Sequence, residues 1–294
     1  MNIQTKEIKS SLLKEKDIHL FIKRIDRLHP FISGNKWFKL KYNLLEAKEK
    51  GYHTVLTFGG AYSNHIYSTA YIANEMGLNS IGLIRGEEHT PLNYTLNYVT
   101  SQGMFLHYVS REDYRKKTDN SFLEGLKRKF GEFYTIPEGG TNNLAIQGAS
   151  EILVKEDSQD FICCPVGTGG TISGLISSVN KEQKVLGFLS VKDRDRINIF
   201  LKSQFSDNRF NLIDDYCFGG YAKINNELVK FINQFYLEYN IVLDAIYTAK
   251  MMFGILELVR ANFFKRKSTI LAIHTGGVQG NIGLNERLGL DLPF

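Results

Sequence analysis

Short apolar runs alternate along the chain with longer segments in which apolar residues recur at helical spacing. The apolar runs predict β-strands at Thr54–Phe58, Ser80–Ile84, Phe105–Val109, Phe133–Ile136, Phe161–Val166, Val185–Leu189 and Thr269–Ile273. The segments between them predict helices at Trp37–Lys50, Ser63–Met76, Pro91–Gln102, Ser121–Phe130, Asn143–Lys155, Ile172–Val179 and Glu227–Tyr239. Continuous apolar strands that alternate with helices are typical of βαβ units, whose parallel sheet is covered on both faces. The pattern therefore predicts an α/β fold.

The composition is that of a soluble globular protein. Of the 294 residues, 43% are hydrophobic and 23% are charged, which excludes a disordered tail or a fibrous array. The net charge is +5, but basic and acidic residues are interleaved, as in Lys14-Glu15-Lys16, so no nucleic-acid partner is expected. No long Pro- or Ser-rich linker divides the chain, so two domains would have to share it discontinuously.

The cysteines and the apolar runs indicate a cytoplasmic protein. Three cysteines, two of them adjacent at Cys163 and Cys164, make neither a disulfide framework nor a metal motif. We expect this adjacent pair to be core residues of a strand. No apolar run reaches the about 18–20 residues that a membrane span needs, and the N-terminus lacks an apolar leader. No membrane partner and no metal are expected.

Lys36 is a candidate nucleophile because of the turn that precedes it. In Gly34-Asn35-Lys36 a glycine turn leads into a helix that begins near Asn35, which places Lys36 in the first helical turn. The positive field of a helix N-terminus favours the neutral amine. A neutral amine is what Schiff-base chemistry requires. Taken alone, the motif is better explained by a solvated surface lysine, because most basic residues are solvated.

Two glycine-rich turns are candidates for binding an anion. Ser63-Asn64-His65 follows a predicted strand, and Ser63 is a suitable N-cap for the next helix, whose free amides can hold a carboxylate or phosphate. The second turn, Gly167 to Thr171, also joins a strand to a helix. It lacks the ending of a nucleotide P-loop, and Asp193 and Asp195 are expected in a charged loop, which disfavours a dinucleotide fold. Capping and structural turns remain the alternative interpretations.

Two further segments complete the set of motifs. Asp244 to Met251 contains Tyr247, which in isolation is a packing residue, and His274 to Gly277 contains Thr275, which is a turn residue. In order and spacing, all these motifs resemble the tryptophan-synthase-β group of pyridoxal-phosphate enzymes. Within that group they resemble the 1-aminocyclopropane-1-carboxylate deaminase / D-cysteine desulfhydrase family.

The resemblance implies the architecture. It implies two α/β domains with mostly parallel sheets, known as PLP fold type II, and pyridoxal 5'-phosphate in the cleft between them. Residues 1–45 and 141–294 would form the larger, cofactor-binding domain, and residues 46–140 the smaller one. The resemblance also implies a homodimer.

The resemblance also implies roles at the cofactor. Lys36 would be the Schiff-base lysine and then the base that takes the Cα proton. Asn64 would hydrogen-bond the ring oxygen, and Thr275 would face the pyridine nitrogen. The phosphate would lie on the amides of Gly167, Thr168, Gly169, Gly170 and Thr171.

The substrate, an amino acid, would be held beside these groups. Ser63, with the amides of Asn64 and His65, would grip its carboxylate. Tyr247 would lie near the reacting carbon. Tyr221 aligns with a second active-site tyrosine, although the Gly and Pro that usually follow it are absent here.

Thr248 and Thr275 distinguish between the activities of the family. Deaminases carry Glu after the tyrosine of the Tyr247 motif and Leu before the final Gly-Gly, and this chain has Thr248 and Thr275 there. We expect Thr248 to contact the substrate. Both residues favour a lyase that catalyses β-elimination from a D-amino acid, D-cysteine above all, to give pyruvate, sulfide and ammonia. The alternatives are a 1-aminocyclopropane-1-carboxylate deaminase, which releases 2-oxobutyrate and ammonia, and a non-catalytic protein that binds a phosphate ligand.

Overall fold

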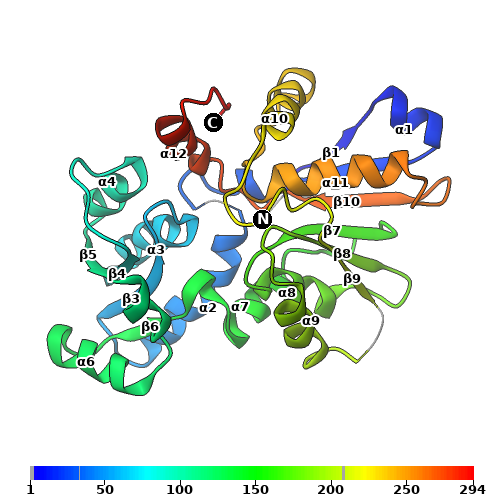
Figure 1. Cartoon of the computed structure of the whole chain (residues 1–294). Helices are drawn as coiled ribbons and strands as arrows, with labels where there is room; N and C mark the ends of the chain where they lie inside the picture. Colours follow the sequence, from blue (N-terminus) through cyan, green and yellow to red (C-terminus); the bar gives the residue numbers. More distant parts are fainter. Residues whose placement is uncertain (1–2, 33, 207–208) are drawn as a thin grey trace.

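Two β-sheets organise the computed structural model, which describes residues 3–32, 34–206 and 209–294 (Figure 1). The larger sheet has the strand order β1 (Thr5–Ile8), β2 (His19–Lys23), β10 (Thr269–Ile273), β7 (Phe161–Val166), β8 (Lys184–Leu189) and β9 (Phe210–Ile213). The smaller sheet has the order β5 (Met104–Val109), β4 (Asn79–Arg85), β3 (Thr54–Gly60) and β6 (Tyr134–Ile136). Every neighbouring pair is parallel except β1 and β2. The predicted α/β fold with mostly parallel sheets is confirmed.

Helices flank both sheets. They are α1 (Ser11–Lys16), α2 (Asn35–Glu49), α3 (Asn64–Glu75), α4 (Tyr94–Ser101), α5 (Arg111–Arg115), α6 (Asn120–Phe130), α7 (Asn143–Ser150), α8 (Gly170–Ser178), α9 (Arg194–Lys202), α10 (Asn226–Tyr239), α11 (Thr248–Arg260) and α12 (Gln279–Leu288). Short 3₁₀ turns lie at Ile25–Arg27 and Glu138–Gly140. Each predicted strand and helix is present, although α7 ends well before the predicted Lys155.

The charged loop expected around Asp193 and Asp195 is in fact the start of a helix. Asp193 is the N-terminal flanking residue of α9, and Asp195 lies in its first turn, where a carboxylate interacts favourably with the helix dipole. The polar sequence of this helix hid its periodicity. The conclusion against a dinucleotide fold does not depend on this point, because neither acid ends a strand.

The larger sheet is covered on both faces. Along β10, Ile270 and Ala272 pack into one apolar cluster with α10 and α11, and Leu271 and Ile273 pack into another with α8 and α9. The adjacent cysteines of β7 follow the same alternation, because Cys163 belongs to the first cluster and Cys164 to the second. Both are fully buried, and burial raises the pKa of each thiol. The prediction that they are core residues is confirmed.

Helix α2 lies between the two halves of the molecule. It packs against α3, which covers the smaller sheet, and against α7 and α8, which belong with the larger sheet (Figure 1). The strands of the smaller sheet come from residues 54–136, inside the predicted smaller domain. The boundaries at 45/46 and 140/141 stay predictions, and α2 crosses the first of them. This arrangement brings the start of α2 close to the carboxyl ends of both sheets.

Candidate active site

A cavity of about 390 Å³ collects side chains from the carboxyl ends of both sheets. The loops after β3, β7 and β10 and the first turn of α2 all contribute to its wall, as expected at such edges of parallel sheets. Of the residues singled out in the sequence, the cavity is lined by Lys36, Ser63, Asn64, His65, Gly167, Thr168, Gly169, Thr171, Tyr221, Tyr247 and Thr275. Gly170 and Thr248 are outside this lining.

Gly34 allows the start of α2 to approach the loop after β10. Its φ is +58°, and a Cβ there would lie 2.0 Å from the carbonyl oxygen of Thr275. The next residue, Asn35, donates its backbone N–H to that same oxygen at 3.2 Å. A side chain at position 34 would therefore push the first turn of α2 away from Thr275.

Lys36 presents an amine to the cavity. Its Nζ donates to Asn35 Oδ1 at 3.1 Å, and Asn35 Nδ2 donates to Thr171 Oγ1 at 2.8 Å, which fixes the turn against α8. Burial lowers the pKa of Lys36 to about 8, and the nearby carboxylate of Asp244 opposes the shift. At pH 7 about a tenth of this amine is therefore unprotonated and able to act as a nucleophile or a base.

A second lysine, Lys39, lies one turn further along α2. It is 2% exposed, and its Nζ donates to Thr141 Oγ1 at 2.9 Å. The Thr141 hydroxyl lies 2.6 Å from that of Thr168 in the glycine-rich loop. Burial, and then the positive charge of Lys36, lower the pKa of Lys39 well below its usual value. Lys39 was not identified from the sequence, although its i+3 spacing places it on the same helix face as Lys36.

Lys39, Thr141, Thr168 and the N-terminus of α8 form an anion cradle. A Cβ on Gly170, the first residue of α8, would lie 3.0 Å from Lys39 Nζ and 2.9 Å from Thr141 Oγ1. The amine therefore lies against the positive end of a helix, and no carboxylate within the described residues comes within 4.0 Å of it. Such an arrangement is stable when a bound anion supplies the compensating charge.

Two tyrosines, Tyr247 and Tyr221, also line the cavity. A Cβ on Gly167 would lie 3.2 Å from Tyr247 Cε1, so glycine is what lets this ring rest on the loop. The rings of Tyr247 and Tyr221 are 6.3 Å apart between centroids. Burial raises the pKa of both hydroxyls, so both stay neutral and can donate hydrogen bonds.

Lys250 holds the loop that carries Tyr221. Its Nζ donates to the carbonyl oxygens of Cys217 at 2.9 Å and Gly220 at 2.7 Å. Burial lowers the pKa of Lys250 to about 8. This lysine on α11 was not identified from the sequence, because nothing local shows that a charged residue of a helix is buried.

The turn before α3 is built as the sequence predicted. Ser63 caps α3, because its Oγ accepts from the backbone N–H of Ile66 at 3.3 Å, and its own O–H is left to donate. Asn64 Oδ1 accepts from Gln279 Nε2 at 2.7 Å, which leaves the amide N–H groups of Asn64 for the cavity. Gln279, on α12, is a site residue that sequence reasoning missed.

The His65 side chain is a buried, neutral support for this turn. Its Nε2 lies 2.7 Å from the hydroxyl of Thr57 on β3. Burial and the positive charges of Lys36 and Lys39 lower the pKa of His65 well below its usual value. The ring therefore carries no charge near neutral pH, and a role in carboxylate binding falls to its backbone amide.

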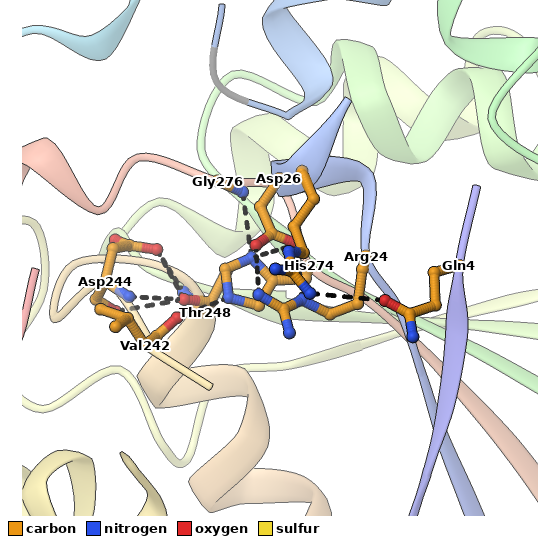
Figure 2. Close-up of polar contacts among 9 residues, drawn as sticks. Gln4, Arg24, Asp26, Val242, Asp244, Thr248, His274 and Gly276 are labelled. Carbon is orange, nitrogen blue, oxygen red and sulfur yellow. Dashed lines mark hydrogen bonds and ion pairs between the residues drawn. The ribbon is translucent and has the colours of Figure 1, made fainter. Parts of the chain in front are cut away.

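The Asp244 carboxylate accepts hydrogen bonds from the residues that follow it, and its contact with Thr248 is drawn in Figure 2. Oδ1 of Asp244 accepts from the backbone N–H groups of Ile246 at 3.0 Å and Tyr247 at 2.8 Å. Its Oδ2 accepts from the Thr248 N–H at 2.9 Å and from the Thr248 hydroxyl at 2.7 Å. The structure gives no support to the expected contact between Thr248 and a substrate, because this side chain is fully buried, bound to Asp244 and outside the lining of the cavity.

A buried network around His274, drawn in Figure 2, holds the residues on either side of Thr275. His274 Nε2 donates to the carbonyl of Val242 at 2.7 Å, and the Gly276 N–H donates to His274 Nδ1 at 3.3 Å. Asp26, which pairs with Arg24 at 2.6 Å, lies 3.5 Å from the same imidazole. These contacts fix the backbone on both sides of Thr275.

The described residues contain no group of three or more His, Cys, Asp or Glu side chains arranged to hold a metal ion. Within the same residues, no helix is long and apolar enough to span a membrane.

Known proteins share both the sequence and the fold. The family model "Pyridoxal-phosphate dependent enzyme" matches residues 3–276. A Thermotoga maritima protein, whose name provisionally assigns 1-aminocyclopropane-1-carboxylate deaminase activity, is 34% identical over 92% of each chain. The mitochondrial "Bifunctional D-cysteine desulfhydrase/1-aminocyclopropane-1-carboxylate deaminase" of Arabidopsis thaliana is 29% identical over 89% of this chain and 73% of its own. The solved structure of an "ACC deaminase homologue" superposes with a TM-score of 0.84 at 28% identity, over 98% of this chain and 93% of the other.

The residues of the cavity fit the cofactor that this family uses. The anion cradle matches a phosphate group, because it combines a buried amine, two hydroxyls and a helix N-terminus. The amine of Lys36 suits an aldehyde, and the free N–H groups of Asn64 suit a ring oxygen. From the match over most of its length and from this fit, the chain belongs to the family of pyridoxal-phosphate-dependent enzymes.

Proposed function

We propose that the protein is a lyase that catalyses β-elimination from a D-amino acid, with D-cysteine as the preferred substrate. One D-cysteine and one water would give pyruvate, hydrogen sulfide and ammonia. The name of the Arabidopsis relative joins D-cysteine desulfhydrase to 1-aminocyclopropane-1-carboxylate deaminase, so both activities are candidates for this site. The choice between them rests on which acid–base groups of the cavity are free to act.

Different residues of the cavity would bind the substrate and move its protons. Bound pyridoxal phosphate supplies the electron sink, and the protein selects the bond that breaks. The amine of Lys36, with its pKa of about 8, takes the Cα proton. The Ser63 hydroxyl and the amides at the start of α3 hold the carboxylate, and the neutral Tyr247 hydroxyl donates to the departing group.

Elimination is favoured over ring opening because the two carboxylates of the cavity wall, those of Asp244 and Glu138, already accept hydrogen bonds. Asp244 accepts four hydrogen bonds from the segment Ile246 to Thr248. Glu138 accepts from the Tyr114 hydroxyl at 2.8 Å and lies 3.4 Å from Lys117 Nζ. Among the described lining residues, the two carboxylates are therefore not free to act, whereas the amine of Lys36 and the Tyr247 hydroxyl are.

This set of groups suits elimination better than ring opening. Opening a cyclopropane needs a proton delivered to carbon, and the position where deaminases place Glu holds the buried Thr248. Hydrosulfide departs with its own electron pair and needs less assistance from an acid. The hydroxyl of Thr275, in place of the deaminase Leu, also offers less apolar contact to ring methylenes.

The second candidate is the deaminase, which the name of the Thermotoga relative favours. Product analysis of the purified, cofactor-loaded protein separates the two. We expect pyruvate from D-cysteine, less from L-cysteine, and little 2-oxobutyrate from 1-aminocyclopropane-1-carboxylate. Robust 2-oxobutyrate with inert D-cysteine would restore the deaminase. A protein that binds no cofactor and forms neither product would instead be the non-catalytic phosphate-ligand binder.

We also propose a homodimer, as the resemblance implies, and a cytoplasmic location, on the basis of the cysteine content. Light scattering on the purified protein tests the dimer, and a single-chain mass would overturn it.

A further inference from the structure

Two further hollows open beside the active-site cavity, and basic side chains line both. Their volumes are about 910 and 230 Å³. Arg85 and Tyr221 line the active-site cavity and both hollows, and Ser63 lines the cavity and the smaller hollow. We call this region the basic vestibule; its basic members are Arg85, Arg111, Arg115, Lys117, Lys223 and Arg287.

The vestibule is assembled from distant parts of the chain. Arg111 comes from α5 beside the smaller sheet, and Arg287 comes from α12, which packs against α4 (Figure 1). Arg85 ends β4, and its Nη2 lies 3.7 Å from where a Cβ on Gly60 would be, at the turn that leads to Ser63. Arg85 therefore lies between the vestibule and the turn at Ser63 that is predicted to bind the substrate carboxylate.

Most of this positive charge has no partner within the protein. No ion pair forms at Arg85, Arg111, Arg115 or Arg287 in the part of the chain that the structure describes. Glu138 is the one acid among the described residues of the larger hollow, and it is bound to Lys117 and Tyr114. Other surface arginines do find carboxylates; they include Arg194 with Asp214, Arg196 with Asp193 and Arg260 with Glu257.

Aromatic rings hold two of these arginines in place. The Arg85 guanidinium lies 5.3 Å from the ring centre of Tyr114, and that of Arg287 lies 5.7 Å from the ring centre of Tyr62. Stacking of this kind leaves the N–H edges free for an oxyanion, which guanidinium groups bind with two parallel hydrogen bonds. Like charges are thus kept together beside the cavity without an internal anion to balance them.

We propose that the basic vestibule binds a second anionic group on the substrate, beyond its α-carboxylate. The substrate class of the site is then amino acids whose β-substituent ends in a carboxylate, sulfonate or phosphate. This inference rests on the proposed β-elimination. For O-phospho-D-serine the Cα–H and Cβ–O bonds break, phosphate leaves with the Cβ–O electron pair, and one water completes the conversion to pyruvate, ammonia and phosphate.

Matched inhibitors test the charge alone. D-aspartate and D-asparagine have nearly the same shape, as do D-glutamate and D-glutamine at greater reach, and each pair differs by one negative charge. In at least one of the two pairs, the one whose side chain is long enough to reach the vestibule, we expect the acid to bind the cofactor-loaded protein at least about tenfold more tightly than its amide. Isothermal calorimetry measures this directly, and competition against D-cysteine cleavage measures it during turnover.

The variants Arg111→Gln and Arg287→Gln, alone and together, locate the effect. Both residues lie outside the lining of the active-site cavity, so kcat/KM for D-cysteine should stay within about twofold while the acid-to-amide ratio falls towards one. Arg128→Gln is the control, because Arg128 is an exposed residue of α6 outside all three linings. It should leave the ratio unchanged.

The outcomes separate this proposal from the one on which it rests. Equal affinity for acid and amide in the unmodified protein, or a ratio that the double variant leaves intact, overturns the vestibule as an anion site. Absence of pyruvate from D-cysteine and from O-phospho-D-serine overturns the proposed elimination instead. Calorimetry still decides the vestibule in that case, because it requires no turnover.

Discussion

Replacing Lys39 with methionine should weaken the binding of pyridoxal phosphate while sparing that of pyridoxal. Pyridoxal has the same aldehyde and ring but no phosphate. Lys39 Nζ lies 2.9 Å from Thr141 Oγ1 and 3.0 Å from the Cβ position of Gly170, so it belongs to the anion cradle that we expect to hold the phosphate. Methionine keeps an unbranched stem of similar length and removes the amine.

The size of the effect follows from the bond that is lost. A hydrogen bond to a charged group contributes about 1.5–3 kcal/mol net. At about 1.4 kcal/mol per factor of ten, the affinity for pyridoxal phosphate should fall by about 10- to 150-fold. The affinity for pyridoxal should change by less than about threefold. The apoprotein should lose little stability, because an amine buried without an anion is costly to keep.

Titrating the apoprotein with each compound, followed by visible absorption, gives both affinities, and urea unfolding gives the stability. Lys48→Met is the matched control, because Lys48 is an exposed residue of the same helix. Equal weakening for pyridoxal and its phosphate would mean that Lys39 supports the cavity only as a structural residue. An unchanged affinity for the phosphate compound would remove Lys39 from the anion cradle.

Three further predictions use other parts of the site. Binding of the cofactor to the apoprotein should become about tenfold faster per pH unit up to a pH of about 8 and then level off, because only the neutral amine of Lys36 reacts. Stopped-flow absorbance measures this rate, and a rate that did not rise with pH would contradict the prediction. Gly34→Ala should unfold at a lower urea concentration than Gly51→Ala. Both glycines have a positive φ, but only at position 34 would the added Cβ clash with backbone atoms. Equal urea midpoints of the two variants would refute the close approach of Gly34 to Thr275. Lys250→Met should lower the free energy of unfolding by about 1–3 kcal/mol, because the two hydrogen bonds from Lys250 Nζ to the carbonyl oxygens of Cys217 and Gly220 are lost, and it should raise KM for D-cysteine by loosening the loop of Tyr221. Unfolding and kinetics that match the parent protein would refute that role.

The α/β architecture could be predicted from the sequence because its central strands are apolar throughout. Strand β7, Phe161–Val166, has the predicted bounds for this reason. Strands β1 and β9 lie at the two edges of the larger sheet, where one side of the strand is unpaired and the residues are partly exposed. β2 follows β1 as its antiparallel partner, again with a mixed burial pattern. Without a continuous apolar run, these strands gave no signal.

The site could be predicted where chemistry is local and not where it depends on distant contacts. A glycine turn followed by a helix places Lys36 and Ser63 from a few neighbouring residues. Lys39 acquires its properties from Thr141, a hundred and two positions away, and from burial that no local pattern reveals. Thr248 was assigned to the substrate from its place beside Tyr247, but the Asp244 carboxylate turns it inward.

The proposal that Lys36 forms the Schiff base with the cofactor can be tested directly by identifying the amine that holds the cofactor. Borohydride reduction of the loaded protein fixes the cofactor to that amine, and tandem mass spectrometry of the peptides then locates it. Lys36 and Lys39 both line the cavity, but Lys36 has a pKa of about 8, whereas Lys39 is 2% exposed and donates to Thr141. The account predicts the label on Lys36 in the unmodified protein and no label in Lys36→Ala. A label on Lys39 or Lys250, or one that persists in Lys36→Ala, would contradict it.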